Sequence, residues 1–476
     1  MDFRTAISLV VAYLVTLLLI RMVILTRRRQ PASTIAWILA IVMLPYVGGL
    51  LYLIFGINRV DRRARVIEEA SRAIHARLPN VDQYELETNR RLNDQQTRLM
   101  KLASHGCDTV PTEKNQVELL TDTNVTFRRI EEAVVAAEDT LHLEYYIWRA
   151  DKSGTRLRDL LIEKAKAGVK VRFLYDGLGS VFLSRKFLKP MRDAGIIVRP
   201  FHSGRSLAAK WSINLRSHRK IVIVDGKVGF TGGMNIGDEY LGRNKAFGYW
   251  RDTHLKLQGP TVLQLQFVFA EDWYCATGEE LLSAEKYPEP EVEGSVIAQV
   301  VSGGPIGNIR AFHALMFTAI NEARDRITLA TSYFVPTDPL AMALETAARR
   351  GVDVRLLLAG RSAHYWTILA GRSYYESLLS AGVTIREYKR GILHSKTLTI
   401  DGHWSLVGSP NFDARSLLLN FEVGVAFYDS EIANQLEAHY EKDIEHARLI
   451  RPMHWAQRPA RHVFAENVCR LFAPIM

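Results

Sequence analysis

One sequence pattern occurs twice in this chain of 476 residues, and the repeat constrains the fold more than any other feature. It reads HRKIVIVDGKVGFTGGMN at 218–235 and HSKTLTIDGHWSLVGSPN at 394–411. Both copies fit H-x-K-x4-D-x6-G-[GS]-x-N without a gap. In each copy, two apolar runs separated by an Asp-Gly pair predict a strand, a tight turn and a second strand. Because side chains two apart on a strand share a face, each His should point the same way as its Lys.

The duplication extends beyond the two motifs. Residues 164–177 are similar to 346–360, and residues 193–201 are similar to 380–388. Helix-like segments that run into strand-like segments predict an α/β fold in each half, with much of the sheet parallel. Two packed copies related by a pseudo-two-fold axis can bring both His/Lys faces to one site.

These patterns predict four regions. Residues 1–60 form a membrane anchor with two apolar helical stretches, and residues 61–115 form connector helices. The two similar halves cover 116–286 and 296–476. Between them, residues 287–295 are rich in proline and glutamate and are predicted to be a linker.

The N-terminal apolar stretches run from Thr5 to Leu25 and from Ala32 to Phe55. They predict a membrane-embedded helical hairpin. A cleaved signal peptide is disfavoured because no small-residue cleavage site follows the first stretch. Pro45, Gly48 and Gly49 interrupt the second stretch, which we expect to kink or to dip into the bilayer and return.

The arginines that flank these stretches bear on orientation. Arg27, Arg28 and Arg29 lie between the stretches, whereas more arginines lie before the first and after the second. Under the positive-inside rule, this distribution favours a catalytic part on the cytoplasmic side.

Charge and cysteine content narrow the partners and cofactors. The formal net charge of +10 predicts an anionic partner, either nucleic acid or phospholipid headgroups. No aromatic-rich nucleic-acid platform accompanies the motifs, so nucleic acid is not expected. Cys107, Cys275 and Cys469 lie far apart and are odd in number, which indicates neither a disulfide framework nor a zinc site. We expect no metal and no other cofactor.

Two histidines and two lysines at one site suit nucleophilic displacement at a phosphate diester. One neutral imidazole can attack phosphorus while the other, protonated, donates to the departing alkoxide. Lys220 and Lys396 would hold the non-bridging oxygens, and Asn235 and Asn411 could donate amide hydrogens to them.

The roles of four acidic residues are less constrained. Asp225 and Asp401 lie in the Asp-Gly turns, so a turn-forming role is at least as plausible as direct chemistry. Asp252 and Glu422 follow their motifs on strand-like segments, and we expect them to orient the histidines. The alternative is that they are surface charges on strands.

The first half carries extra residues just before its histidine, within 202–217. Arg205, Lys210 and Arg216 lie in this insert, and we expect them to help hold anionic headgroups at the mouth of the site. The alternative is an ordinary solvated loop.

The two motifs resemble the HKD signature of the phospholipase D superfamily. Other segments resemble bacterial cardiolipin synthases: the apolar run 31–56, EYYIW at 144–148, YDGLGS at 175–180, SGGP at 302–305 and the ending CRLFAPIM at 469–476. The likeness spans nearly the whole chain.

This resemblance implies an enzyme of the bacterial inner membrane that transfers a phosphatidyl group between two phosphatidylglycerol molecules, giving cardiolipin and glycerol. It implies catalytic roles for the residues His218, Lys220, Asp225, His394, Lys396 and Asp401. A phosphatidyl-histidine intermediate would form on His218 by family analogy, and the other histidine would give its proton to glycerol.

Three alternatives stay open. Hydrolysis of the phospholipid by water shares the covalent intermediate with transfer, so residue chemistry cannot separate the two. A membrane-anchored nuclease and a non-catalytic binder of anionic lipid are the others. The sequence does not predict an oligomeric state.

Overall fold

The chain separates into two compact units in a computed structural model. One comprises residues 1–65 with 204–213, and the other comprises 66–203 with 214–476. The structure describes residues 3–25, 31–53, 84–86, 92–107, 109–201, 216–281, 287–290, 294–305 and 310–472.

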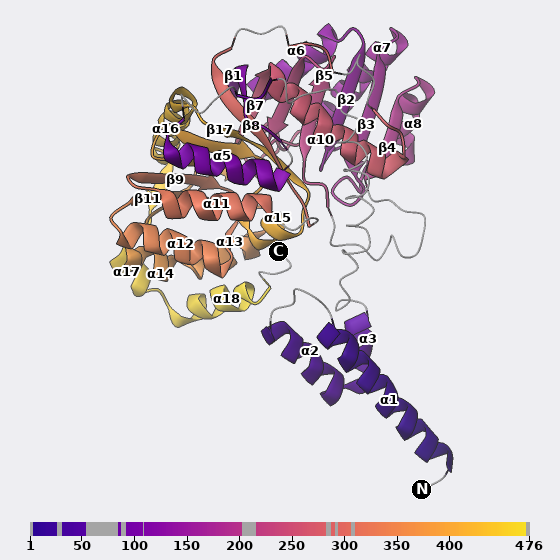
Figure 1. Cartoon of the computed structure of the whole chain (residues 1–476), viewed down its shortest axis with the longest axis vertical. Helices are drawn as coiled ribbons and strands as arrows, with labels where there is room; N and C mark the ends of the chain where they lie inside the picture. The colour runs from indigo at the N-terminus through magenta and orange to yellow at the C-terminus, as the bar shows by residue number, and fades with distance from the viewer. Residues whose placement is uncertain are drawn as a thin grey trace. The chain divides into compact units, whose positions relative to one another are not determined.

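In the described residues of the smaller unit, the helices are α1 (Phe3–Leu25), α2 (Pro31–Met43) and α3 (Pro45–Leu51) (Figure 1). They share a small apolar core of Leu19, Val23, Ile41 and Tyr52. The predicted interruption at Pro45 is confirmed, because this proline begins α3 and the chain bends at the preceding residue. The two glycines, by contrast, lie inside α3.

Many large apolar side chains of α1, α2 and α3 are exposed. Among the residues that the structure describes, no helix is both long and apolar enough to cross a bilayer, so the two predicted spans are not found there.

The larger unit contains a sheet of sixteen strands that runs through both predicted halves. The first half contributes β1 (Thr112–Asp122), β2 (Thr140–Tyr145), β3 (Lys170–Asp176), β4 (Ile197–Phe201), β5 (Lys220–Val224), β6 (Val228–Gly232) and β7 (Tyr249–Gln258). The second half contributes β8 (Val296–Gly303), β9 (Arg326–Thr331), β11 (Asp353–Ala359), β12 (Thr384–Tyr388), β13 (Gly391–Leu393), β14 (Lys396–Ile400), β15 (Trp404–Gly408), β17 (Glu422–Phe427) and β18 (Ala447–Leu449). A separate pair joins β10 (Phe334–Val335) to β16 (Phe412–Asp413).

The order of the strands repeats outward from the centre of the sheet. From β1 the first half runs β7, β6, β5, β2, β3, β4, and from β8 the second half runs β17, β15, β14, β9, β11, β12. Antiparallel pairing of β1 with β8 joins the two series. The prediction of two similar α/β halves is therefore confirmed. Parallel pairing is limited to β2-β3-β4 and β9-β11-β12 among these ladders, and the motif hairpins are antiparallel.

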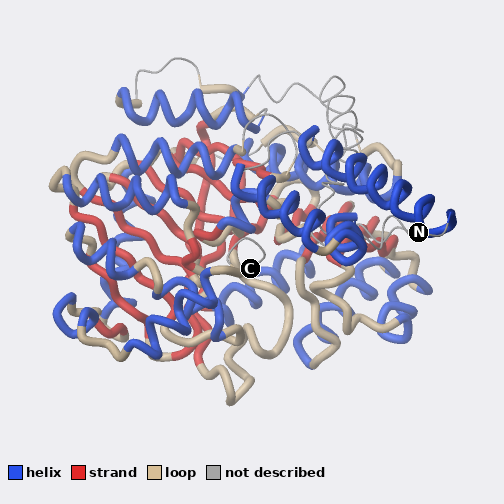
Figure 2. Tube along the Cα trace, turned by 90° about the horizontal axis from the view of Figure 1, so that it is seen from below, coloured by secondary structure: helices blue, strands red, loops and turns tan. Residues whose placement is uncertain are grey.

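Helices cover the strands on both faces, as Figure 2 shows for the larger unit. The first half has α6 (Thr123–Ala136), α7 (Lys152–Lys166), α8 (Arg185–Asp193) and α10 (Pro260–Thr277). The second half has α11 (Ala311–Glu322), α12 (Asp338–Arg349), α13 (Tyr365–Arg372), α14 (Tyr375–Ala381), α15 (Ala414–Leu418), α16 (Ser430–Ile444), α17 (Pro452–Ala456) and α18 (Ala460–Arg470).

Helix α10 lies at the junction of the halves. Its side chains Leu265 and Phe269 share one apolar core with Val423 and Val425 of β17 and with Leu436 of α16. The halves therefore share buried surface and form one unit. The predicted linker 287–295 lies between α10 and β8, and residues 291–293 fall outside the described part of the chain.

Helix α5 (Asp94–Cys107) departs from the predicted role of a connector (Figure 1). It packs on α11 and β8 of the second half, although it precedes the first half in sequence. Leu99 and Ala103 enter the core of the second half, and the Gln96 side-chain amide donates to the backbone oxygen of His403 at 2.7 Å. Most of the other predicted connector residues lie outside the described ranges.

Candidate active site

Each histidine of the repeated motif is held in place by the opposite half. The backbone N–H of His218, just before β5, donates to the backbone oxygen of Phe421 at 2.8 Å. Correspondingly, the N–H of His394, just before β14, donates to the oxygen of Arg251 at 2.6 Å. Short parallel pairings, β13 with β7 and Ser217 with Phe421, extend these contacts. The segment that leads into each motif hairpin therefore lies beside the first residues of a strand from the other half.

This exchange places each imidazole against a carboxylate of the other half. His218 Nδ1 lies 2.9 Å from Glu422 Oε2, and His394 Nδ1 lies 2.6 Å from Asp252 Oδ2. Both acids are fully buried, so neither is a surface charge. The structure thus brings Asp252 and Glu422 to the histidines, each to the histidine of the opposite motif.

Both histidines line one cavity of about 340 Å³. Asn235 and Asn411 line it as well. The oxygen of Asn235 accepts from the Ile147 amide at 3.2 Å, and the oxygen of Asn411 accepts from the Ser332 hydroxyl at 2.7 Å. These contacts fix the orientation of both asparagine side chains at the cavity wall.

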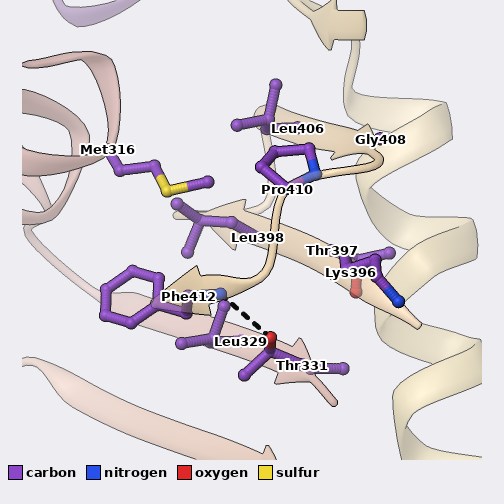
Figure 3. Close-up of a pocket in the computed structure, with 11 residues that line it drawn as sticks. Met316, Leu329, Thr331, Lys396, Thr397, Leu398, Leu406, Gly408, Pro410 and Phe412 are labelled. Carbon is purple, nitrogen blue, oxygen red and sulfur yellow. Dashed lines mark hydrogen bonds between the residues drawn. The ribbon is translucent and has the colours of Figure 1, made fainter. Parts of the chain in front are cut away.

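The two lysines of the motifs are buried beside the histidines. Lys220 Nζ donates to the backbone oxygen of His218 at 2.5 Å, and Lys396 Nζ donates to that of His394. Lys396 also donates to Ser332 Oγ at 3.2 Å. Figure 3 shows Lys396 at one end of β14, with its amine directed away from the apolar side chains Met316 and Phe412. Each lysine therefore contacts the backbone of the histidine of its own motif.

Burial shifts the proton equilibria of all four cationic groups. It lowers the pKa of His394 to about 4, with Lys396 adding to the effect and Asp252 opposing it. The pKa of His218 is also lowered by burial, and Glu422 opposes the shift. Burial lowers the pKa of Lys220 to about 7 and that of Lys396 to about 8. In the free site near neutral pH, the imidazoles are therefore neutral and the lysines are close to their titration midpoints.

The two carboxylates stay charged despite their burial. Burial favours the neutral acid, but His394 and Lys396 outweigh it and lower the pKa of Asp252. For Glu422, the contact with His218 and the charge of Lys220 outweigh burial in the same way, so its pKa is lowered. A charged carboxylate that accepts from Nδ1 fixes the tautomer and leaves Nε2 as the reactive nitrogen.

Asp225 and Asp401 are not brought to the histidines, so their assignment to direct chemistry needs correction. The carboxylate of Asp225 accepts from three consecutive backbone amides, at 138–140, at 2.7–2.9 Å. Asp401 accepts from the amides at 324–326 at 2.8–2.9 Å. Each lies at the far end of its strand, about 20 Å along the chain from the histidine. With φ of 52° and 51°, the two aspartates close the hairpins and tie them to the preceding loops.

The structure describes only part of the basic insert before His218. Arg205 and Lys210 lie outside the described residues. Arg216 is half-buried, and its backbone oxygen accepts from the Phe421 amide at 2.8 Å. Burial lowers the pKa of its guanidinium, and Asp176 opposes the shift. The headgroup role of the three residues stays a prediction.

The motif position occupied by Gly233 and Ser409 contacts the two buried acids, a role that the sequence reasoning did not assign to it. Ser409 Oγ donates to Glu422 Oε2 at 2.5 Å. In the other half, a Cβ at Gly233 would stand 2.0 Å from Asp252 Oδ1. The longer acid therefore has a serine partner, whereas the shorter acid needs a glycine. The difference between Gly and Ser at this motif position is visible in the sequence. It can be interpreted only once the structure shows that Asp252 lies beside Gly233 and Glu422 beside Ser409.

Arg219, at a variable position of the motif, is buried and helps to hold the backbone of Glu422 in place. Its guanidinium pairs with Asp272 in the interior, and its Nε donates to the backbone oxygen of Glu422 at 3.2 Å.

Two aromatic rings pack against the imidazoles. The centroid of Tyr146 lies 4.8 Å from that of His218, and the centroid of Trp250 lies 5.3 Å from that of His394.

Among the described residues, no group of three or more His, Cys, Asp or Glu side chains could hold a metal ion. The duplicated fold and the paired His/Lys hairpins around one cavity define the class of phospholipase D-like proteins. The family model described as "Cardiolipin synthase, PLD-like domain" matches residues 130–273 and 316–444. A second, "Phospholipase_D-nuclease N-terminal", matches residues 12–56. The chain belongs to the cardiolipin synthase family of PLD-like proteins.

Full-length relatives agree with this assignment. A cardiolipin synthase of Geobacillus kaustophilus is 40% identical over 97% of this chain and 92% of its own length. Cardiolipin synthase 2 of Bacillus cereus is 39% identical over 98% of this chain and 91% of its own length. The fold is similar to that of a crystal structure of phosphatidylserine synthase from Haemophilus influenzae, with a TM-score of 0.60 and 14% identity. That match covers 79% of this chain and 99% of the other.

The contrast between Gly233 and Ser409 yields a testable prediction. In Gly233→Ser, the new side chain collides with the Asp252 carboxylate, which must move and release His394. We expect turnover to fall about a hundredfold or more, because small misplacements of a reacting group cost that much. Turnover of the proposed phosphatidylglycerol substrate, followed by product analysis, measures the effect.

The matched control is the reverse change, Ser409→Gly, which removes one hydrogen bond to Glu422 and leaves space. Its loss should be about tenfold, as expected for one charge-assisted hydrogen bond. Equal losses in the two variants would contradict the steric argument.

Proposed function

We propose that this protein is a phosphatidyltransferase that makes cardiolipin and glycerol from two phosphatidylglycerol molecules. The observation that carries the proposal is the crossed pairing of two histidines with two buried carboxylates at one cavity. Relatives named cardiolipin synthase over nearly the full chain favour transfer over hydrolysis and over nuclease activity.

In the first step, Nε2 of His218 attacks phosphorus and the bond from phosphorus to the glycerol oxygen breaks. Lys220 and Lys396 stabilise the non-bridging oxygens, together with the amides of Asn235 and Asn411. His394 gives its proton to the departing glycerol. The pKa of His394 is about 4 in the free site, so this imidazole is neutral before substrate binds. The negative charge of the diester in the cavity raises that pKa, and His394 then takes up the proton that it gives to glycerol.

In the second step, a hydroxyl of the second phosphatidylglycerol attacks the phosphatidyl-histidine. His394, now neutral, accepts the proton of that hydroxyl. The nitrogen–phosphorus bond breaks, cardiolipin forms and His218 is free again. Hydrolysis would follow the same course with water as the acceptor, and this is the second candidate function.

The remaining site residues act through the reacting groups. Asp252 and Glu422 orient the imidazoles. Asp225 and Asp401 hold the hairpins in place and do not contact substrate. The basic residues Arg205, Lys210 and Arg216 help hold anionic headgroups.

The smaller unit associates with the bacterial inner membrane, and the catalytic unit lies on its cytoplasmic side. Exposed apolar side chains of α1, α2 and α3 support this association, which does not need a crossing helix because helices can lie at the interface. A reporter enzyme that works only in the cytoplasm, fused after residue 476, should be active. Activity of a reporter that works only after export, fused at the same position, would place the catalytic unit on the other side of the membrane.

The reaction is tested with purified protein and phosphatidylglycerol labelled in the headgroup glycerol and in one acyl chain. We expect labelled cardiolipin and free glycerol. Phosphatidic acid in place of cardiolipin would show hydrolysis, and an absence of lipid turnover would refute both candidate functions. His218→Ala and His394→Ala should each lower turnover at least about a hundredfold. His105→Ala, which changes an exposed histidine on α5, is the matched control and should retain activity.

The pH dependence follows from the buried lysines. As pH rises through about 7–8, Lys220 and Lys396 lose their protons and their charge, so kcat/KM should fall over this range. A bound phosphodiester anion raises the pKa of both lysines, so the corresponding fall in kcat should occur at higher pH. Rate profiles between pH 5 and 10 measure the fall in kcat/KM and the fall in kcat. A kcat/KM that stays constant to pH 9.5 would contradict a role for the lysine charges.

A further inference from the structure

A loop of the first half, residues 177–183 after β3, is fastened to the wall of the active-site cavity. Ser180 Oγ donates to the backbone oxygen of Tyr146 at 2.9 Å and accepts from the Trp148 amide at 3.0 Å. Tyr146 lines the cavity, and its ring stands edge-on to His218. The loop therefore borders the cavity on the side of His218.

A loop of the second half occupies the equivalent position after β11. Residues 361–364 line the cavity themselves, and Tyr365 and Trp366 begin α13 directly after them. The His364 ring stacks on that of Trp366 with centroids 5.8 Å apart. Because β3 and β11 are equivalent strands of the duplicated fold, the two loops lie at the same cavity, one from each half.

The first loop and the start of α13, directly after the second loop, present large apolar side chains to the outside. These are Leu178, Val181, Phe182, Tyr365 and Trp366, here called the rim. Phe182 is 69% exposed and Trp366 is 58% exposed. Phe182 also lies 5.4 Å from the guanidinium of Arg149, a residue of the cavity wall. Single exposed apolar residues need no explanation, but a group on two loops that border one cavity indicates a binding surface.

Basic side chains accompany the rim. Arg185 and Lys186 are exposed at the start of α8, one residue after the first loop, and Arg361 is exposed within the second loop. Aromatic rings beside cationic side chains are the combination that suits the boundary between lipid headgroups and acyl chains. Cations near this boundary are attracted to anionic lipids.

We propose that the rim inserts into the surface of an anionic lipid bilayer and holds the cavity mouth at the level of the headgroups. This inference rests on the proposed function, because it explains how the site reaches diesters whose acyl chains stay in the membrane. With the rim inserted, the phosphate can enter the cavity while the acyl chains keep most of their apolar environment. Two flanking loops also suit a reaction that takes two lipids in turn.

Insertion is measured through the fluorescence of Trp366 in the full-length protein. The protein carries His218→Ala so that no lipid is consumed, and it is mixed with phosphatidylglycerol vesicles that contain lipids brominated along the acyl chain. The signal of Trp366 is the difference between this protein and the same protein with Trp366→Phe. We expect quenching by lipids brominated near the headgroup end of the chain. A difference signal that brominated lipids do not quench would overturn the proposal.

The contribution to turnover is measured with the double variant Phe182→Ser, Trp366→Ser in otherwise unaltered protein. Activity is assayed on phosphatidylglycerol vesicles and on short-chain phosphatidylglycerol below its critical micelle concentration. We expect the ratio of vesicle to monomer activity to fall about tenfold or more, because two side chains lose their apolar contact with lipid. The control Val135→Ser, Met342→Ser removes two exposed apolar side chains outside the rim and should leave the ratio unchanged.

The outcomes separate the two proposals. If the unaltered protein turns over neither substrate form, the proposed function fails, whatever the fluorescence shows. If it turns over both forms and the double variant keeps the normal ratio, the rim proposal fails and the function stands. If the double variant keeps the ratio but loses self-association in sedimentation, the rim covers a second copy of the chain, and the bilayer proposal is likewise overturned.

Discussion

The crossed contact between an imidazole of one half and a carboxylate of the other is the interaction on which the site depends. His218 contacts Glu422 and His394 contacts Asp252. In each case the backbone N–H of the histidine also donates to the backbone oxygen of the residue just before the acid in the sequence. For these two described pairs, each half supplies the histidine of one pair and the carboxylate of the other. Removing a histidine leaves a buried, charged carboxylate without its partner, at a cost of about 3–5 kcal/mol. The duplicated fold therefore acts as one catalytic unit, which agrees with the apolar core that the two halves share through α10.

The same burial that fixes the geometry also sets the charges. Two lysines and two carboxylates lie close to the histidines. The carboxylates favour the charged form of the lysines, and the lysines favour the charged form of the carboxylates. Burial is nevertheless the largest influence on both lysines, whose pKa values fall to about 7 and 8. A phosphodiester that enters brings the negative charge that favours the protonated lysines and one protonated histidine. The site is thus electrostatically incomplete until an anionic substrate occupies it, which couples binding to proton uptake.

Local features of this site could be predicted from the sequence because their causes are local. The apolar runs on either side of Asp225-Gly226 and Asp401-Gly402 predict both hairpins, which the structure contains as β5-β6 and β14-β15. The sequence also indicated that Asp252 and Glu422 serve the histidines. It could not indicate the crossing, because strand register between distant segments decides which acid meets which histidine. The docking of α5 was unpredictable for a similar reason: Leu99 and Ala103 give the apolar stripe of a helix, but a stripe does not specify which half it covers.

Although the two halves repeat one design, their histidines are not physically equivalent. Asp252 is short and is approached closely by Gly233, where no side chain fits, and it accepts from the backbone amide of Thr253 at 2.8 Å. Glu422 is longer and accepts instead from the hydroxyl of Ser409, with the Asn420 amide at 3.3 Å from its other oxygen. The two acids thus stabilise their charges with different donors and hold their imidazoles at different distances. A reaction that needs one neutral nucleophile and one proton carrier requires such a difference, and the different donors to Asp252 and Glu422 supply it next to the two histidines. This difference between the two histidines lies among the described residues of the larger unit, so it does not depend on the basic insert that precedes His218 in the sequence.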